Sequence, residues 1–250
     1  MYQTVSGLTI RSVNYRESDQ ILTVLTEDRG LLTVKARGTR RKGSRTRAAS
    51  QLFTLSRMTL FEQRGRFVLH EAEILQQFPG LSTSLTSLSL ASYFAEVLGT
   101  EAEDSPASPE VLRLALNCLY ALSCNLCPER AVKAAFELRY MALAGYSPAL
   151  DRCCVCGRAD IPAPRVMLAA GTVRCGSCPA PGQGGAEAIL SPASLDCARY
   201  LLSCDLKKLF SFRLAEEELS RLGRFTERYL LTCMEREFRT LDFYKNVGDT

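Results

Sequence analysis

The spacing of the apolar residues changes near residue 80, and this change constrains the fold more than any other feature of the chain. Before that point, β-branched and apolar residues come in short alternating runs separated by turn residues. From Ser84 onward they recur at steps of three and four residues, which predicts a helix whose apolar face is Leu85, Leu88, Ala91, Ala95 and Leu98. Alternation is typical of strands, and the longer steps are typical of one face of a helix. The sequence therefore predicts an α+β protein with a β-rich first third and a helical remainder.

The β-rich third contains five predicted strands. A turn at 28–30 (DRG) and another at 64–66 (RGR) carry the glycines that separate neighbouring runs. Five short strands in so few residues are most simply closed into a small barrel, because closure removes exposed sheet edges. We therefore predict an OB-fold barrel over residues 1–80. The five runs are 4–15, 20–27, 31–36, 51–63 and 67–78.

The third and fourth of these runs are connected by a strongly basic segment, KARGTRRKGSRTR at 35–47. It contains seven basic residues and no acidic one, and Gly38 and Gly43 interrupt any helix or strand, so we expect a flexible loop. Such a concentration of charge favours a polyanion, above all a phosphate backbone, although a solvated loop without a partner is the alternative. The predicted nucleic-acid-binding residues are Lys35, Arg37, Arg40, Arg41, Lys42, Arg45 and Arg47, and Arg11, Arg57, Arg64 and Arg66 extend the patch.

The positive charge of the whole chain is also concentrated in the β-rich part. The chain has a formal net charge of +4, and residues 1–80 hold 13 Lys and Arg against 7 Asp and Glu, so the remainder is slightly acidic. Aromatic residues in the β-rich part could stack on bases, although on so small a barrel each belongs more often to the core. We expect the single histidine, His70, to be a half-buried barrel residue. The aromatic candidates are Tyr2, Tyr15, Phe53, Phe61 and Phe67.

The helical remainder is predicted as one domain over 81–149 and 191–243. Helix starts are marked by Ser84, by Ser108 with Pro109 behind it, and by Ser191. Gly145 is the expected C-terminal cap of the helix over 129–144. The segment 101–110 (EAEDSPASPE) is an expected linker. The predicted helices cover 84–98, 109–122, 129–144, 192–209 and 214–240.

A loop-rich module over 150–190 interrupts the helices and carries two C-x-x-C pairs. The pairs are Cys153 with Cys156 and Cys175 with Cys178, and eighteen residues separate Cys156 from Cys175. This spacing predicts a four-cysteine zinc site, because two knuckles complete a tetrahedron of thiolates. Four protein ligands leave no open position, so one structural Zn2+ is expected; redox-active or unpaired thiols are the alternative. Cys154 is a possible replacement for Cys153 as a ligand.

Motifs of common enzyme classes are absent from the sequence. It contains no P-loop, no dinucleotide-binding glycine fingerprint and no G-x-S-x-G, and neither C-x-x-C pair lies in a βαβ setting. It also shows no signal peptide and no apolar run of membrane-spanning length. We therefore expect a non-catalytic protein located in the cytoplasm, and binding of DNA by the basic segment would associate it with the nucleoid.

Several short motifs, in their order and spacing along nearly the whole chain, resemble the family of the bacterial recombination mediator RecO. The resemblance implies an OB-fold, a helical domain and a zinc element. It also implies binding of single- and double-stranded DNA, annealing of complementary strands, and loading of RecA onto DNA coated by the single-strand-binding protein SSB, with RecR as a partner. The motifs are 15–19 (YRESD), 25–27 (LTE) before Gly30, 36–38 with Arg41 and Ser44, 136–139 (FELR), 144–148 (AGYSP) before the first C-x-x-C-G, and 222–223 (LG) with 229–230 (YL).

Two other functions remain open from the residues alone. One is an RNA-binding OB protein with a zinc ribbon, which competition between matched DNA and RNA strands would distinguish. The other is a protein-interaction scaffold whose basic loop is incidental. The sequence does not indicate where an SSB tail would dock, the stoichiometry with RecR, the oligomeric state, or whether DNA also contacts the helical domain.

Overall fold

The computed structural model describes residues 1–100, 108–181 and 185–248, and it divides the chain into two compact units. The first unit combines Met1–Cys124 with Phe238–Thr250, and the second unit is Asn125–Glu237. This division into two units does not correspond to the predicted division into a barrel, a helical domain and a zinc module. The bounds of those three parts stay a prediction. Most of the predicted linker over 101–110 lies outside the described residues.

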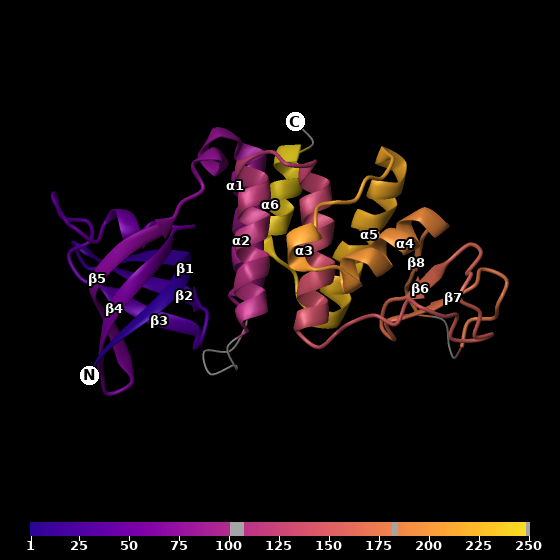
Figure 1. The fold of residues 1–250 in the computed structure, drawn as a ribbon, viewed down its shortest axis with the longest axis horizontal. Helices are drawn as coiled ribbons and strands as arrows, with labels where there is room; N and C mark the ends of the chain where they lie inside the picture. The colour runs from indigo at the N-terminus through magenta and orange to yellow at the C-terminus, as the bar shows by residue number, and fades with distance from the viewer. Residues whose placement is uncertain (101–107, 182–184, 249–250) are drawn as a thin grey trace. The chain divides into compact units, whose positions relative to one another are not determined.

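The five predicted strands form a closed barrel in the order β1-β2-β3-β5-β4, which confirms the predicted OB-like fold. All neighbouring strands are antiparallel except β3 and β5, which pair in parallel through Val34↔Phe67 and Lys35↔Val68. Figure 1 shows the strands curling around one another. The strands are β1 (Tyr2–Tyr15), β2 (Asp19–Thr26), β3 (Gly30–Ala36), β4 (Leu55–Gln63) and β5 (Arg66–Gln76).

The barrel interior follows from the alternation of side chains along these strands. Every second residue points inward, so the apolar members of each run meet inside and the polar members face solvent. Removing each valine, leucine or methionine side chain of this core from water contributes about 1.5–3 kcal/mol. The buried core consists of Val5, Leu22, Val24, Leu32, Val34, Ala36, Met58, Leu60 and Leu69.

The fourth strand begins later than predicted. Residues 51–54 were expected to continue it, but β4 starts at Leu55. Instead, Phe53 takes a left-handed backbone (φ 58°) and donates its N–H to the Thr9 carbonyl at 2.8 Å, while the Thr9 N–H donates to the Thr54 carbonyl at 3.1 Å. The chain is therefore hydrogen-bonded to β1 before it enters the strand.

Helices and short 3-10 turns complete the described part of the first unit. The predicted N-caps are confirmed: Ser84 accepts the Ser87 N–H at 3.1 Å, and Ser108 accepts the Val111 N–H at 3.4 Å. The predicted apolar face of the first helix is partly wrong, because Leu85 is 59% exposed. The elements are η1 (Ala48–Ser50), η2 (Pro79–Thr83), α1 (Leu85–Leu98), α2 (Pro109–Ser123) and α6 (Arg239–Gly248). Instead of the predicted face, α1 buries one that includes Tyr93, and it packs beside α6 (Figure 1).

The second unit packs α4 and α5 against α3 and adds a small sheet in the order β7-β6-β8. Two predicted helices were too long. The one expected over 192–209 ends at Ser203, and the one expected over 214–240 ends at Met234 because Glu235 takes a left-handed backbone (φ 50°). The elements are α3 (Glu129–Leu143), β6 (Arg165–Met167), β7 (Thr172–Arg174), β8 (Glu187–Ile189), α4 (Pro192–Ser203), η3 (Leu206–Lys208) and α5 (Glu216–Met234).

A buried ionic network joins α3 to α5. The Lys133 ammonium lies 2.7 Å from a Glu137 oxygen and 2.8 Å from a Glu227 oxygen, and Thr226 donates its hydroxyl to Glu137 at 2.7 Å. Burial raises the pKa of Glu137, although Lys133 opposes this change. Burial alone would lower the pKa of Lys133, but the two carboxylates raise it above its ordinary value. No described helix combines the length and apolar character that crossing a membrane requires.

The contact between η2 and the end of α2 gives a test of the fold. Gly80 donates its N–H to the Ser123 hydroxyl at 3.0 Å, and a Cβ added to Gly80 would lie 1.9 Å from the Ser123 carbonyl oxygen. Because backbone must move to relieve this clash, we expect Gly80→Ala to lower the free energy of unfolding by about 1–3 kcal/mol. Urea titration followed by circular dichroism measures the change.

Gly223→Ala is the matched control. Gly223 lies inside α5, and an added Cβ there meets no heavy atom within 4 Å, so this substitution should stabilise the protein by about 0.5–1 kcal/mol. Wild-type stability of Gly80→Ala would contradict the described packing of η2 on α2.

Candidate nucleic-acid interface and metal centre

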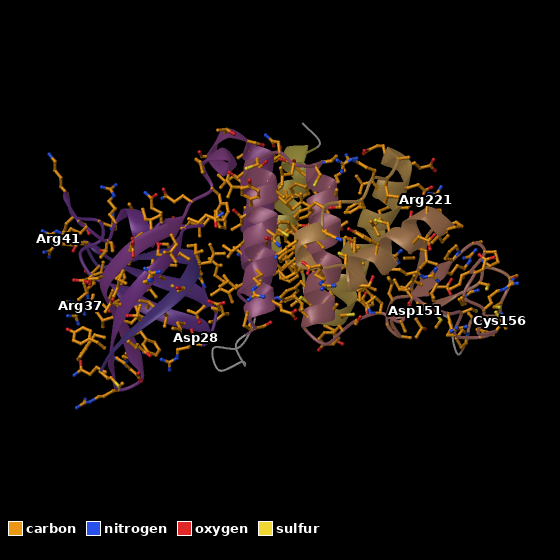
Figure 2. All side chains as sticks on the ribbon, viewed as in Figure 1. Asp28, Arg37, Arg41, Asp151, Cys156 and Arg221 are labelled. Carbon is orange, nitrogen blue, oxygen red and sulfur yellow. The ribbon has the colours of Figure 1, made fainter. Side chains whose placement is uncertain are left out.

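The basic loop, defined here as residues 37–47, carries six of the seven predicted nucleic-acid-binding residues, and all six side chains are exposed. The seventh, Lys35, lies on β3 and is half-buried. Figure 2 shows Arg37 and Arg41 at the outer surface of the barrel. The six exposed residues are Arg37, Arg40, Arg41, Lys42, Arg45 and Arg47.

One carboxylate anchors the start of the basic loop. Asp19, at the beginning of β2, accepts the Gly38 N–H at 2.9 Å and lies 3.4 Å from the Lys35 ammonium. Gly38 has a left-handed backbone (φ 65°), which turns its N–H toward the barrel. The Gly38 N–H, followed by Lys35, lowers the pKa of Asp19, although partial desolvation opposes this effect.

The other groups of the barrel that accept hydrogen bonds from the basic loop are uncharged. The Arg40 N–H donates to the Ser18 carbonyl at 3.1 Å, the Arg40 guanidinium donates to the Glu17 carbonyl at 3.1 Å, and the Arg41 guanidinium donates to the Ser18 hydroxyl at 3.3 Å. Within the ranges 1–100, 108–181 and 185–248, Lys35 is the only one of the seven predicted residues with an ion-pair partner. The basic loop is therefore a series of hydrogen-bonded turns that leaves its positive charge uncompensated.

An open groove extends this positive surface at the junction of β3 and β5. Its volume is about 450 Å³, and it brings the predicted extension residues Arg64 and Arg66 beside Lys35 and Arg37. Arg57 does not join the surface as a free cation, because it pairs with Glu73 at 3.0 Å. The groove is lined by Lys35, Arg37, Gln63, Arg64, Arg66, Phe67 and Val68.

The aromatic candidates divide into exposed and buried groups. Tyr2 and Tyr15 are exposed, and the Lys35 ammonium lies 4.9 Å from the centre of the Tyr15 ring. Phe61 and Phe67 are half-buried, and Phe53 is buried. The prediction for His70 was wrong, because its side chain is exposed and its ring lies 5.1 Å from that of Tyr2.

The four predicted metal ligands meet at one point in the second unit. The sulfurs of Cys153, Cys156, Cys175 and Cys178 lie within 4.8 Å of one another. The Cys153 sulfur is 3.9 Å from that of Cys178, and the Cys156 sulfur is 3.8 Å from that of Cys175. Cys154 is exposed and does not belong to this cluster.

Backbone N–H groups stabilise a thiolate in this cluster. Burial opposes ionisation of Cys153, but N–H groups of Cys156, Cys175 and Val155 lower its pKa to about 6; the Cys175 N–H lies 3.3 Å from the Cys153 sulfur. Burial and the neighbouring sulfurs raise the pKa of Cys175 to about 12. Closely grouped thiols with N–H donors are suited to a metal ion, which would favour the thiolate form at every position.

Two arginines of the loop-rich module make specific contacts beside the cluster. Arg174 forms two hydrogen bonds to the Glu187 carboxylate, at 2.9 and 3.0 Å, and donates to the carbonyls of Cys175 and Cys178. Arg152 donates to the Gly157 carbonyl at 3.4 Å. These two arginines therefore hold the turns that carry the cysteines.

A small closed barrel with a basic loop, followed by helices and a loop-rich module that carries a four-cysteine cluster, defines the chain as an OB-type protein with a candidate metal centre. Two family models together match most of its length: "Recombination protein O N terminal" over residues 1–78 and "Recombination protein O C terminal" over residues 82–242. The chain therefore belongs to the RecO family of DNA repair proteins, as its motifs predicted.

Individual relatives agree with this assignment. A protein of Desulforudis audaxviator named "DNA repair protein RecO" is 33% identical over 99% of this chain and 97% of its own length. Proteins with the same name are 29% identical in Symbiobacterium thermophilum, over 96% of this chain and 95% of the relative, and 31% identical in Desulfitobacterium hafniense, over 94% and 86%.

The Asp19 anchor gives a test of the loop's order. We expect Asp19→Ala to release the turn at Gly38, so that trypsin cleaves within residues 37–47 faster than in the wild-type protein. Folding lowers the pKa of Asp19. The stabilisation that its carboxylate gives to the folded loop is therefore complete above pH 3.8, its ordinary pKa, and is lost as the pH falls through the lower pKa of the folded state. The protection of the Gly38 amide, measured as its hydrogen exchange relative to the intrinsic rate at the same pH, should therefore decrease only below pH 3.8.

Asp28→Ala is the control, because Asp28 lies in the exposed turn between β2 and β3 (Figure 2). Its trypsin cleavage rate within 37–47 should match the wild type. Equal cleavage of Asp19→Ala and wild type would show that the carboxylate does not hold the loop.

Proposed function

We propose that the chain is a non-catalytic recombination mediator that binds single- and double-stranded DNA through the basic loop. The observation that carries this proposal is the set of six exposed cations, none of which has an ion-pair partner among the described residues. A phosphate backbone presents closely spaced negative charges, and its binding releases condensed counterions. Contacts to phosphates read little sequence, which suits a protein that acts on any strand.

Annealing of complementary strands follows from the same charge. A cationic surface reduces the repulsion between two phosphate backbones while their bases pair. Membership of the RecO family supports the remaining parts of the proposal, which are loading of RecA onto SSB-coated DNA and RecR and SSB as protein partners. The cytoplasmic, nucleoid-associated location belongs to the same proposal.

We also propose that the four-cysteine cluster holds one structural Zn2+. Four cysteine sulfurs within 4.8 Å of one another fit the tetrahedral thiolate set that zinc prefers. The short strands β6, β7 and β8 of three residues each bury little apolar surface. Metal binding would therefore supply much of the folding free energy of this region.

The basic loop is tested by replacing Arg40, Arg41 and Lys42 together with Ala. We expect weaker binding to a single-stranded oligonucleotide and a flatter salt dependence, because each lost phosphate contact reduces the slope of log K against log salt by about 0.7. Fluorescence anisotropy across salt concentrations measures both quantities. Strand annealing with and without SSB should slow in parallel.

The control removes the same charge elsewhere, by replacing the exposed residues Arg113, Lys207 and Lys208 with Ala. A decrease of equal size in both triple variants would indicate an effect of net charge alone, and an unchanged slope in the loop variant would remove the loop from the interface. A clear preference for RNA over DNA of matched sequence would favour an RNA-binding function.

Elemental analysis should find about one zinc per chain, because the cluster contains a single set of four sulfurs. We expect Cys175→Ser to lose the metal and to lower the melting temperature, and a chelator should act on the wild-type protein in the same direction.

Cys154→Ser is a closely matched control, since Cys154 neighbours the cluster but is exposed and outside it. It should keep both the metal and the wild-type melting temperature. A fully folded zinc-free protein, or loss of zinc in Cys154→Ser, would contradict the assignment.

A further inference from the structure

A continuous row of side chains crosses the outer face of the barrel. Strand pairing places Lys35 of β3 opposite Val68 of β5, Val68 opposite Phe61 of β4, and Phe61 opposite Tyr2 of β1. Neighbouring strands lie about 4.8 Å apart, so three steps span about 14 Å. The row therefore connects a cation at one end with aromatic rings at the other.

Burial of the adjacent residues shows that this row faces solvent. Val34, Leu60 and Leu69 precede or follow row members along their strands, and all three point into the barrel core. Because successive side chains of a strand alternate between faces, the row members point outward. Tyr2 is 57% exposed, which is not the environment of a core aromatic residue.

His70 joins the aromatic end of the row through a β-bulge. Leu60 pairs with Leu69 but Thr59 pairs with Glu71, so His70 is the extra residue on β5. Bulges redirect a side chain and recur beside functional sites. The Tyr2 ring centre lies 5.1 Å from both the Phe61 and the His70 ring centres, with interplanar angles of 53° and 57°.

The charged end of the row opens into the groove at the junction of β3 and β5. Lys35 and Val68 belong to both the row and the groove, where Arg37, Arg64 and Arg66 add three more cations. An aromatic surface continuous with clustered cations matches a ligand that combines flat rings with phosphates. Single-stranded nucleic acid has this chemistry, whereas a duplex keeps its base faces stacked inside.

We propose that unpaired bases of single-stranded DNA stack on Tyr2, Phe61 and His70 while the adjoining phosphates enter the groove. This inference rests on the proposed function and adds a substrate preference to it, because the row can hold only strands whose bases are free. The basic loop binds backbones of either kind, and the row distinguishes unpaired from paired strands.

The chain contains no tryptophan, so Tyr2→Trp introduces a single indole reporter into the row. We expect saturable quenching of its fluorescence by an oligo-dT strand, because a base stacks on the indole, and no quenching by an abasic strand of equal length. Tyr120→Trp is the matched control, since Tyr120 is 50% exposed, lies on α2 of the same unit and is not a member of the row. The control should show no quenching with either strand.

The double variant Tyr2→Ala with His70→Ala measures the contribution to affinity. We expect its affinity for oligo-dT to decrease by about tenfold. Its affinities for the abasic strand and for duplex DNA should stay at the wild-type level. A folding defect, in contrast, would lower these two affinities as well. Equal quenching of Tyr2→Trp by both strands, or unchanged oligo-dT affinity of the double variant, would overturn the stacking row alone. Failure of the wild-type protein to bind any of the three ligands would overturn the DNA-binding proposal as well.

Discussion

The proposed role of the first unit depends on how the basic loop is attached to the barrel. The groups that hold the loop do not cancel its charge. A loop could be ordered by pairing its arginines with acids, but such pairs would neutralise the surface that a polyanion needs. Here Ser18 supplies a hydroxyl and a carbonyl, Glu17 supplies its carbonyl, and Asp19 pairs with Lys35 and accepts the Gly38 N–H. Repulsion between two exposed charges 4 Å apart is about 1 kcal/mol in water, so the turns can hold the remaining cations together.

The fold could be predicted where local patterns decide it. Alternating runs and turn glycines gave five strands, and serine caps gave helix starts, since both signals act within a few residues. The predictions failed where tertiary contacts determine the local structure. Residues 51–54 look like the start of a strand but bond to Thr9 of β1. Leu85 fits a helical stripe yet is exposed, because α1 buries the face that meets α6. The break at Glu235 separates two segments whose apolar spacing predicts one continuous helix.

The candidate sites show the same contrast. The cysteine cluster was predictable because each C-x-x-C knuckle is a local structure, and only the meeting of two knuckles depends on the fold. The loop's charge was predictable from composition, but its anchor was not, because Asp19 lies nineteen residues from Gly38 in the sequence. The aromatic row was least predictable. It depends on the register of four strands and on a bulge that turns His70 outward, and neither feature has a signal in a single sequence.

In the proposed function, charge and stacking would respond differently to the state of the DNA, and this difference would give annealing a direction. The proposed contact between the basic loop and phosphates would act over the Debye length of the solution, whether or not the bases are paired. The proposed stacking on Tyr2, Phe61 and His70, the aromatic end of the row, would act only at contact and only on free base faces. When two strands pair, the product keeps its attraction to the loop but loses its contact with the row. Duplex formation would therefore weaken binding at the row, and the protein would favour release of the annealed product over release of the single strands.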